Sequence, residues 1–100
     1  MPIAAIETAL RDKLTAFDTL GRVVKFDCSP DGAIVVDART PPAALSQDSS
    51  AAADCTLEMS ATVLGQILDG ELDPTGAFMS GKLHIKGDMS IAMQLASILG

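Results

Sequence analysis

The sequence predicts an α+β domain in which helices cover one side of a β-sheet. Apolar side chains recur three and four positions apart over residues 3–17, which is typical of an amphipathic helix. Apolar and polar residues then alternate in three segments between residues 22 and 60, which indicates strands. Short helical patterns and one further strand follow. Because strands and helices fall in separate blocks, we expect segregated layers.

The first expected helix covers residues 3–17 and has one apolar side. Pro2 lies near its first turn and Gly21 just past its end, where these residue types are favoured. The apolar side is formed by Ile3, Ile6, Leu10, Leu14 and Phe17.

Two alternating segments, residues 22–28 and 33–38, flank the turn sequence SPDG and predict a hairpin. Residues 40–52 are small, polar and proline-rich, so their pattern predicts a surface loop. Residues 54–60 alternate again and predict a third strand. The pattern favours an antiparallel arrangement of these three strands.

Residue types that begin and end helices recur in the next part of the chain. Ser60 is placed to cap a helix that Gly70 ends. Asp73 and Pro74 then open a shorter helix, and Gly81 ends it. Residues 82–87 predict a strand with alternating sides, and Asp88 is placed to cap the last helix.

Composition excludes several classes of partner. The formal net charge is −6 and no basic cluster offsets it, which disfavours nucleic acid and anionic membrane surfaces. Aromatic residues make up only 3% of the chain, so stacking platforms are not expected. No apolar run reaches the ~20 residues that span a bilayer, and the first residues lack the basic region of a signal peptide. We therefore expect a cytoplasmic protein without stable membrane insertion.

The sequence offers no catalytic constellation. His84 is the only histidine, and it is expected on the outward side of its strand without an acid or nucleophile nearby. Cys28 and Cys55 lack metal-ligand spacing and fall on the inward sides of their strands, so we expect two buried free thiols. No metal or cofactor and no enzymatic activity are expected.

The last helix is apolar on more than one side. One stripe contains Ile91, Leu95 and Ile98, and a second contains Met89, Met93 and Ala96. The first stripe can pack on the sheet, whereas the second needs a partner of its own. Ordinary core packing, a ligand cavity and a dimer face all remain open on this pattern alone.

The order of motifs in the second half resembles the sterol carrier protein type-two family. The earlier part also fits, with an amphipathic helix followed by the run Val24-Lys25-Phe26 before the turn. The matching motifs are Gly70, Asp73-Pro74, Ala77-Phe78, Gly81-Lys82-Leu83, Ile85, Gly87-Asp88-Met89, Ala92-Met93 and Leu95.

This resemblance implies a mixed, mainly antiparallel five-stranded sheet with helices on one side, which enclose an apolar tunnel. The strand that the pattern does not show would lie within residues 42–50. The resemblance also implies one domain over residues 1–100 and a non-catalytic carrier of sterol-like, fatty acyl, phospholipid or isoprenoid ligands. The alternative is an interaction module that dimerises or docks on a lipid-processing enzyme through its last helix.

Combining the strand and helix phases with the resemblance gives a set of expected ligand-lining residues. They are Phe26, Ile34, Val36, Leu57, Met59, Leu64, Ile67, Leu68, Phe78, Leu83, Ile85, Met89, Ala92, Met93 and Leu99.

Overall fold

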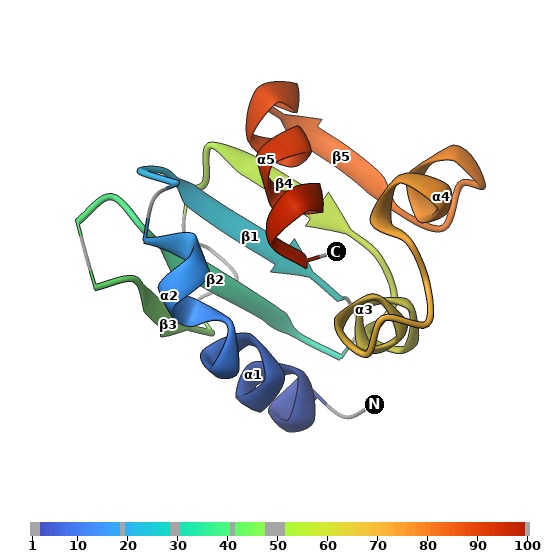
Figure 1. Cartoon of the computed structure of the whole chain (residues 1–100), viewed down its shortest axis with the longest axis horizontal. Helices are drawn as coiled ribbons and strands as arrows, with labels where there is room; N and C mark the ends of the chain where they lie inside the picture. The colour runs from blue at the N-terminus through green and yellow to red at the C-terminus, as the bar shows by residue number, and fades with distance from the viewer. Residues whose placement is uncertain (1–2, 19, 29–30, 41, 48–51, 100) are drawn as a thin grey trace.

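The computed structural model describes residues 3–18, 20–28, 31–40, 42–47 and 52–99 (Figure 1). Its elements, in chain order, are α1 (Ile3–Asp12), α2 (Leu14–Phe17), β1 (Val23–Asp27), β2 (Ala33–Asp37), β3 (Ala44–Ser46), β4 (Cys55–Glu58), α3 (Ala61–Leu68), α4 (Pro74–Met79), β5 (His84–Gly87) and α5 (Met89–Leu99).

The strands form one mixed sheet in the order β3-β2-β1-β4-β5. Neighbouring strands are antiparallel except β1 and β4, which run parallel, with Phe26 beside Leu57. The expected fold class is therefore confirmed. The expectation of three antiparallel strands is wrong for β4, because a long connection through β2 and β3 returns the chain to the other side of β1 in the same direction.

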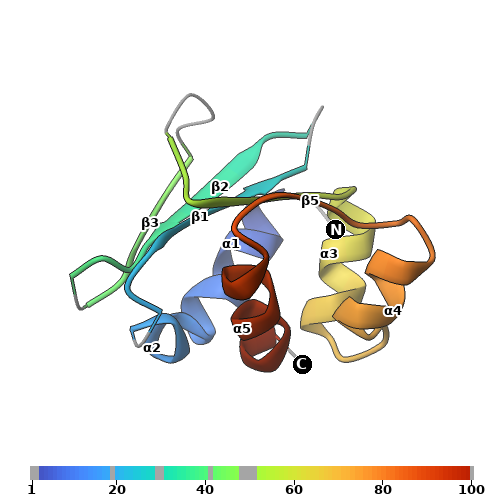
Figure 2. The same cartoon turned by 90° about the horizontal axis from the view of Figure 1, so that it is seen from above.

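The helices of the described residues, α1 to α5, lie on the same side of the sheet (Figure 2). The sheet side chains facing them alternate with outward ones, so Val24 and Phe26 of β1 are fully buried while Lys25 between them is partly exposed. The rings of Phe17 and Phe26 meet edge to face, with centroids 6.4 Å apart. Each buried ring contributes about 1.5–3 kcal/mol to stability, so this contact anchors α2 on β1.

The helix expected over residues 3–17 is divided into α1 and α2 at Lys13. The Lys13 amide donates to the carbonyl of Leu10, three residues back and not four, which tightens the turn. Leu10 and Phe17, on either side of this break, are both fully buried. The apolar stripe therefore stays buried from α1 to α2, although the two segments do not form one continuous helix.

Strand β3 lies inside the segment that the local pattern assigned to a loop. Ala44 and Ser46 are exposed and only Leu45 is partly buried, so three residues give almost no alternation to detect. The strand is instead defined by pairing with β2, in which Leu45 lies opposite Val36. The fifth strand expected between residues 42 and 50 is confirmed.

The helix starts follow the expected caps. The Ser60 hydroxyl accepts a hydrogen bond from the Val63 amide at 3.1 Å, and the Asp73 carboxylate accepts one from the Gly76 amide at 3.3 Å. At the start of α5, the Asp88 carboxylate accepts from the Ser90 amide at 2.9 Å. Each bond satisfies an amide that has no partner within its helix.

Asp54 joins three elements at the end of the sheet where α5 begins. Its carboxylate accepts from the Val23 amide at 2.9 Å, and its carbonyl accepts from the Asp88 amide at 3.1 Å. Gly87, the last residue of β5, has φ +104°, and a Cβ there would lie 2.5 Å from the Asp54 carbonyl oxygen. Only glycine fits this approach without displacing backbone.

We therefore predict that Gly87→Ala lowers the free energy of unfolding by more than about 2 kcal/mol, because it combines backbone strain with a clash. The matched control is Gly81→Ala, where φ is +80° but open space surrounds the position. That control should cost only about 1 kcal/mol of left-handed strain. Urea unfolding followed by circular dichroism measures both. Equal losses would show that the Asp54 approach does not constrain α5.

Candidate functional site

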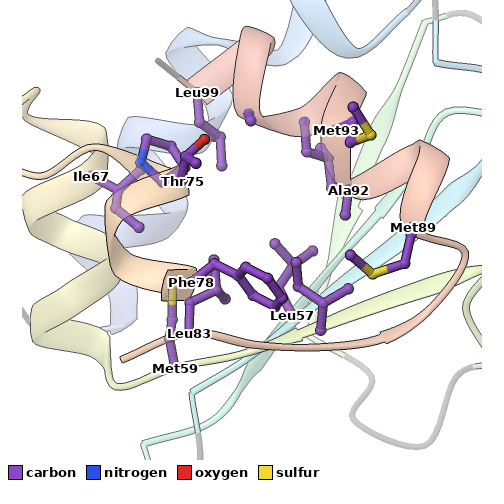
Figure 3. A pocket seen from close by; sticks show the side chains of 14 residues that line it. Leu57, Met59, Ile67, Thr75, Phe78, Leu83, Met89, Ala92, Met93 and Leu99 are labelled. Atoms are coloured by element: carbon purple, nitrogen blue, oxygen red, sulfur yellow. The ribbon is translucent and has the colours of Figure 1, made fainter. Parts of the chain in front are cut away.

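An apolar pocket of about 180 Å³ lies on the helix side of the sheet, between β4, β5 and the last three helices (Figure 3). Fourteen residues from these elements and their connections line it. They are Leu57, Met59, Ile67, Pro74, Thr75, Phe78, Leu83, Ile85, Met89, Ala92, Met93, Leu95, Ala96 and Leu99.

The sheet contributes the floor of the pocket. Leu57 of β4 and Ile85 of β5 are directly opposite each other in the antiparallel register. Strand alternation sends both side chains toward the helices, while the flanking Glu58 and His84 take the other side. This pair therefore faces the pocket from the sheet side.

Helix α5 forms one wall through the stripe for which the sequence showed no partner. Met89, Ala92, Met93 and Ala96 line the pocket at spacings of three and four. The other stripe is part of the protein core, where Ile91 and Leu95 are buried; Leu95 also reaches the pocket. The two apolar sides of this helix therefore have two different surroundings.

The pocket exists because the α5 wall is partly made of small side chains. Ala92 and Ala96 contribute only methyl groups to this wall. Larger side chains such as leucine and phenylalanine pack the rest of the core. On the opposite wall, α4 is held by the Asp73 cap and by Pro74, which is buried. Close packing leaves few voids within protein interiors, and here the space stays open where Ala92 and Ala96 present methyl groups on adjacent turns of α5.

The chemistry of the lining suits hydrocarbon. Thirteen of the fourteen side chains are apolar, and the hydroxyl of Thr75 is the one polar group. A dry apolar cavity of ~150 Å³ already accepts a small hydrocarbon such as benzene. The volume is below the ~300–1,000 Å³ of typical ligand sites, so a longer ligand would extend past the exposed side chains of Phe78, Met89 and Met93.

Ten of the fifteen residues expected to line a ligand site do line this pocket. They are Leu57, Met59, Ile67, Phe78, Leu83, Ile85, Met89, Ala92, Met93 and Leu99. Their contact with a ligand stays a prediction, and so does the continuation of the pocket into a tunnel.

The other five expected residues do not reach the pocket. They are Phe26, Ile34, Val36, Leu64 and Leu68. The first four are fully buried in the main core and Leu68 packs against its edge. For the three strand residues the reason is the helices that cover them: α1 and α2 lie against the β1–β2 half of the sheet (Figure 2), and the Phe17 ring packs on Phe26. Leu64 and Leu68 belong to α3, which packs against α1. Inward phase on a strand shows that a side chain is buried, but not whether protein or a cavity faces it.

Four lining residues were not expected from the sequence: Pro74, Thr75, Leu95 and Ala96. Ala96 belongs to the methionine stripe of the last helix, so that stripe already contained the signal. Leu95 was expected to pack in the core, and it lies both in the core and in the lining of the pocket. Pro74 and Thr75 open α4, and no local pattern indicates which way so short a helix faces.

The polar residues that could carry chemistry lie elsewhere. His84 is exposed on the outer side of the sheet, opposite Glu58 of β4. Cys28 and Cys55 are free, fully buried thiols. Burial, aided by the charges of Asp27 and Asp31, raises the pKa of Cys28 to about 11, and burial also raises the pKa of Cys55. Neither thiol is set up as a nucleophile.

No group of three histidine, cysteine or acidic side chains within the described residues is arranged to hold a metal ion. Among the helices that the structure describes, none has the length and apolar content to cross a bilayer.

Comparison with known sequences identifies the chain's relatives. The model of the SCP-2 sterol transfer family matches residues 3–100. Sterol carrier protein 2 of Rattus norvegicus is 39% identical over 64 residues, which are 64% of this chain and 12% of that protein. Hydroxysteroid dehydrogenase-like protein 2 of Xenopus tropicalis is 46% identical over 55 residues, which are 55% of this chain and 13% of that protein. The chain thus corresponds to a small part of these longer relatives.

Solved structures share the fold. The apo form of sterol carrier protein 2 from Yarrowia lipolytica aligns with a TM-score of 0.71 at 20% identity, covering 94% of this chain and 83% of that one. A structure described as the UbiJ-SCP2 ubiquinone synthesis protein aligns with a TM-score of 0.67 at 19% identity, covering 96% of this chain and 90% of that one. With the family match over almost its whole length, the chain belongs to the SCP-2 sterol transfer family, as the order of its motifs predicts.

Proposed function

We propose that this protein is a non-catalytic carrier that binds a hydrophobic small molecule in the pocket between α4, α5 and the β4–β5 edge. The observation that carries the proposal is an open apolar space in a chain of only 100 residues, lined by thirteen apolar side chains and one hydroxyl. Small domains gain stability by filling such a space. Keeping it open costs stability, and a bound ligand offsets that cost.

The small volume of the pocket favours a ligand with a flexible hydrocarbon chain over a rigid ring system. A volume of about 180 Å³ admits part of an acyl or isoprenoid chain, which can enter segment by segment. A fused ring system needs its full width at once. Relatives support both possibilities: a similar structure is described as palmitated SCP2L2 from Aedes aegypti, and others are described as sterol carrier proteins. We therefore place ligands with a flexible chain (fatty acyl, isoprenoid and phospholipid) ahead of sterol.

A second candidate is an interaction module that dimerises or docks on a lipid-processing enzyme. Four exposed large apolar side chains at and beside the pocket favour it: Phe78, Met79, Met89 and Met93. The same side chains would be covered by a ligand only in part, since Met79 does not line the pocket. Relatives in which the matching region is a small part of a longer protein add to this candidate.

Lipid removal followed by titration distinguishes the two candidates. Delipidated protein is expected to bind a fluorescent fatty acid with one saturable site and to stay monomeric in light scattering as its concentration rises. Native mass spectrometry of freshly purified protein, followed by organic extraction, identifies the lipid that accompanies it. A mass that grows with concentration, without probe uptake, would overturn the carrier proposal in favour of the module.

We predict that Ala92→Leu blocks uptake without unfolding the protein, because the added isopropyl group enters the existing space. Probe affinity should fall by about tenfold or more, and the free energy of unfolding should stay within about 1 kcal/mol of the parent or rise. The matched control is Ala61→Leu, since Ala61 of α3 is buried but does not line the pocket. It should lose about 1–3 kcal/mol through overpacking and keep its affinity. Loss of affinity in Ala61→Leu together with loss of stability alone in Ala92→Leu would contradict the proposed site.

We also predict that His84→Gln leaves probe uptake unchanged, because His84 lies on the far side of the sheet from the pocket. Neither this variant nor the parent should turn over acyl esters or thioesters, as judged by the release of free acid. Hydrolysis by the parent that disappears in the variant would make the protein an enzyme.

A further inference from the structure

The methionines are unevenly exposed around the pocket. Of those in the described residues, Met93 is 72% exposed and Met89 48% exposed, and both line the pocket. Met59 lines it from the floor but is only 6% exposed. Met79 is 81% exposed and does not line it. The described residues therefore include two accessible thioethers in the pocket lining, one buried methionine in the lining, and one exposed methionine outside the lining for comparison.

Cysteine thiols are normally the first side chains that peroxides oxidise, but the two cysteines of this protein are not accessible to them. Cys28 and Cys55 have no exposed surface, and the only oxidisable form, the thiolate, is disfavoured because burial raises the pKa of both thiols. The accessible sulfur atoms of the described part of the chain are thus thioethers. Under mild oxidation they react first.

We propose that Met89 and Met93 form an oxidation site that controls the pocket, in which conversion to methionine sulfoxide by a hydroperoxide weakens the binding of hydrocarbon ligands. This inference rests on the proposed carrier function and adds a form of regulation to the same site. It needs neither a disulfide nor a change of fold.

The chemistry is a two-electron oxygen transfer. The thioether sulfur attacks one oxygen of the peroxide, an S–O bond forms, and the O–O bond breaks. Hydrogen peroxide leaves as water, and an organic hydroperoxide leaves as the alcohol. The sulfur is oxidised, the peroxide is reduced, and the hydrogen of the attacked oxygen moves to the departing oxygen. Methionine sulfoxide reductases reverse the change, with a thiol as the two-electron reductant.

The effect on affinity follows from what surrounds the new oxygen. In the free protein both side chains are exposed, so the sulfoxide oxygen is hydrated and folding is not penalised. A hydrocarbon that covers them removes that water. The lining offers one side-chain donor, the Thr75 hydroxyl on α4 across the pocket, so at least one sulfoxide is left without a hydrogen bond. Burying one such group corresponds to a loss of about tenfold or more in affinity.

The test compares reduced and peroxide-treated protein by three measurements: peptide mass spectrometry, titration with a fluorescent fatty acid, and urea unfolding. Mass increments of one oxygen are expected on Met79, Met89 and Met93 before Met59 or either cysteine. Affinity should fall about tenfold or more with an unchanged unfolding midpoint, and treatment with methionine sulfoxide reductases should restore it.

Two leucine variants locate the effect, since leucine has a similar volume and no sulfur. Each is compared with its own untreated form. The double variant Met89→Leu/Met93→Leu should show no loss of affinity on peroxide treatment, whereas Met79→Leu should lose as much as the parent.

The outcomes separate the two proposals. If untreated protein takes up no probe, the carrier function fails and this inference falls with it. If untreated protein binds and the oxidised protein binds equally well, only the inference is overturned. Loss of affinity that persists in the double variant, or first oxidation at the buried sulfur atoms, overturns it as well.

Discussion

The parallel pairing of β4 with β1 is the constraint on which the rest of the molecule depends. It places Leu57 beside Phe26 in the middle of the sheet and makes β5 the outer strand on the side opposite β3. A hairpin-only sheet would have put β4 beside β3, far from β1. Because β4 and β5 extend the sheet past α1 and α2, their inner side is left for α3, α4 and α5 to cover (Figure 1). The Asp54 hydrogen bonds and the close approach of Gly87 fix the start of α5 over this extension.

The inner side of one sheet is therefore packed in two ways. Over β1 and β2, large buried side chains such as Phe17 pack against the strands. Over β4 and β5, the alanines of α5 leave about 180 Å³ empty. The filled half contains the two largest fully buried side chains, Phe17 and Phe26, and their burial stabilises the fold. The empty half can then remain open without unfolding the protein.

The exposed apolar side chains at the opening of the pocket have two opposing consequences. Exposed apolar side chains on a small acidic protein favour association, whereas the proposed carrier function requires an apolar entrance. Methionine is compatible with both requirements because its long unbranched side chain adapts its shape at little cost. The same thioether is open to oxidation, which gives the entrance a chemical sensitivity that leucine would lack.

Local sequence determined the helix caps, the hairpin, the inward and outward sides of the strands and the two apolar sides of the last helix. These features depend on neighbours within four residues, as in the Ser60 and Asp73 caps, so a linear pattern contains them. Motif order added the family and the fifth strand, although β3 itself shows no alternation. Only the tertiary structure decided which buried residues face a cavity. Phe26 and Leu57 have the same phase and lie side by side, yet one meets protein and the other meets open space. That difference depends on which helix covers each strand and how large its side chains are, and both are set by contacts between residues far apart in the chain.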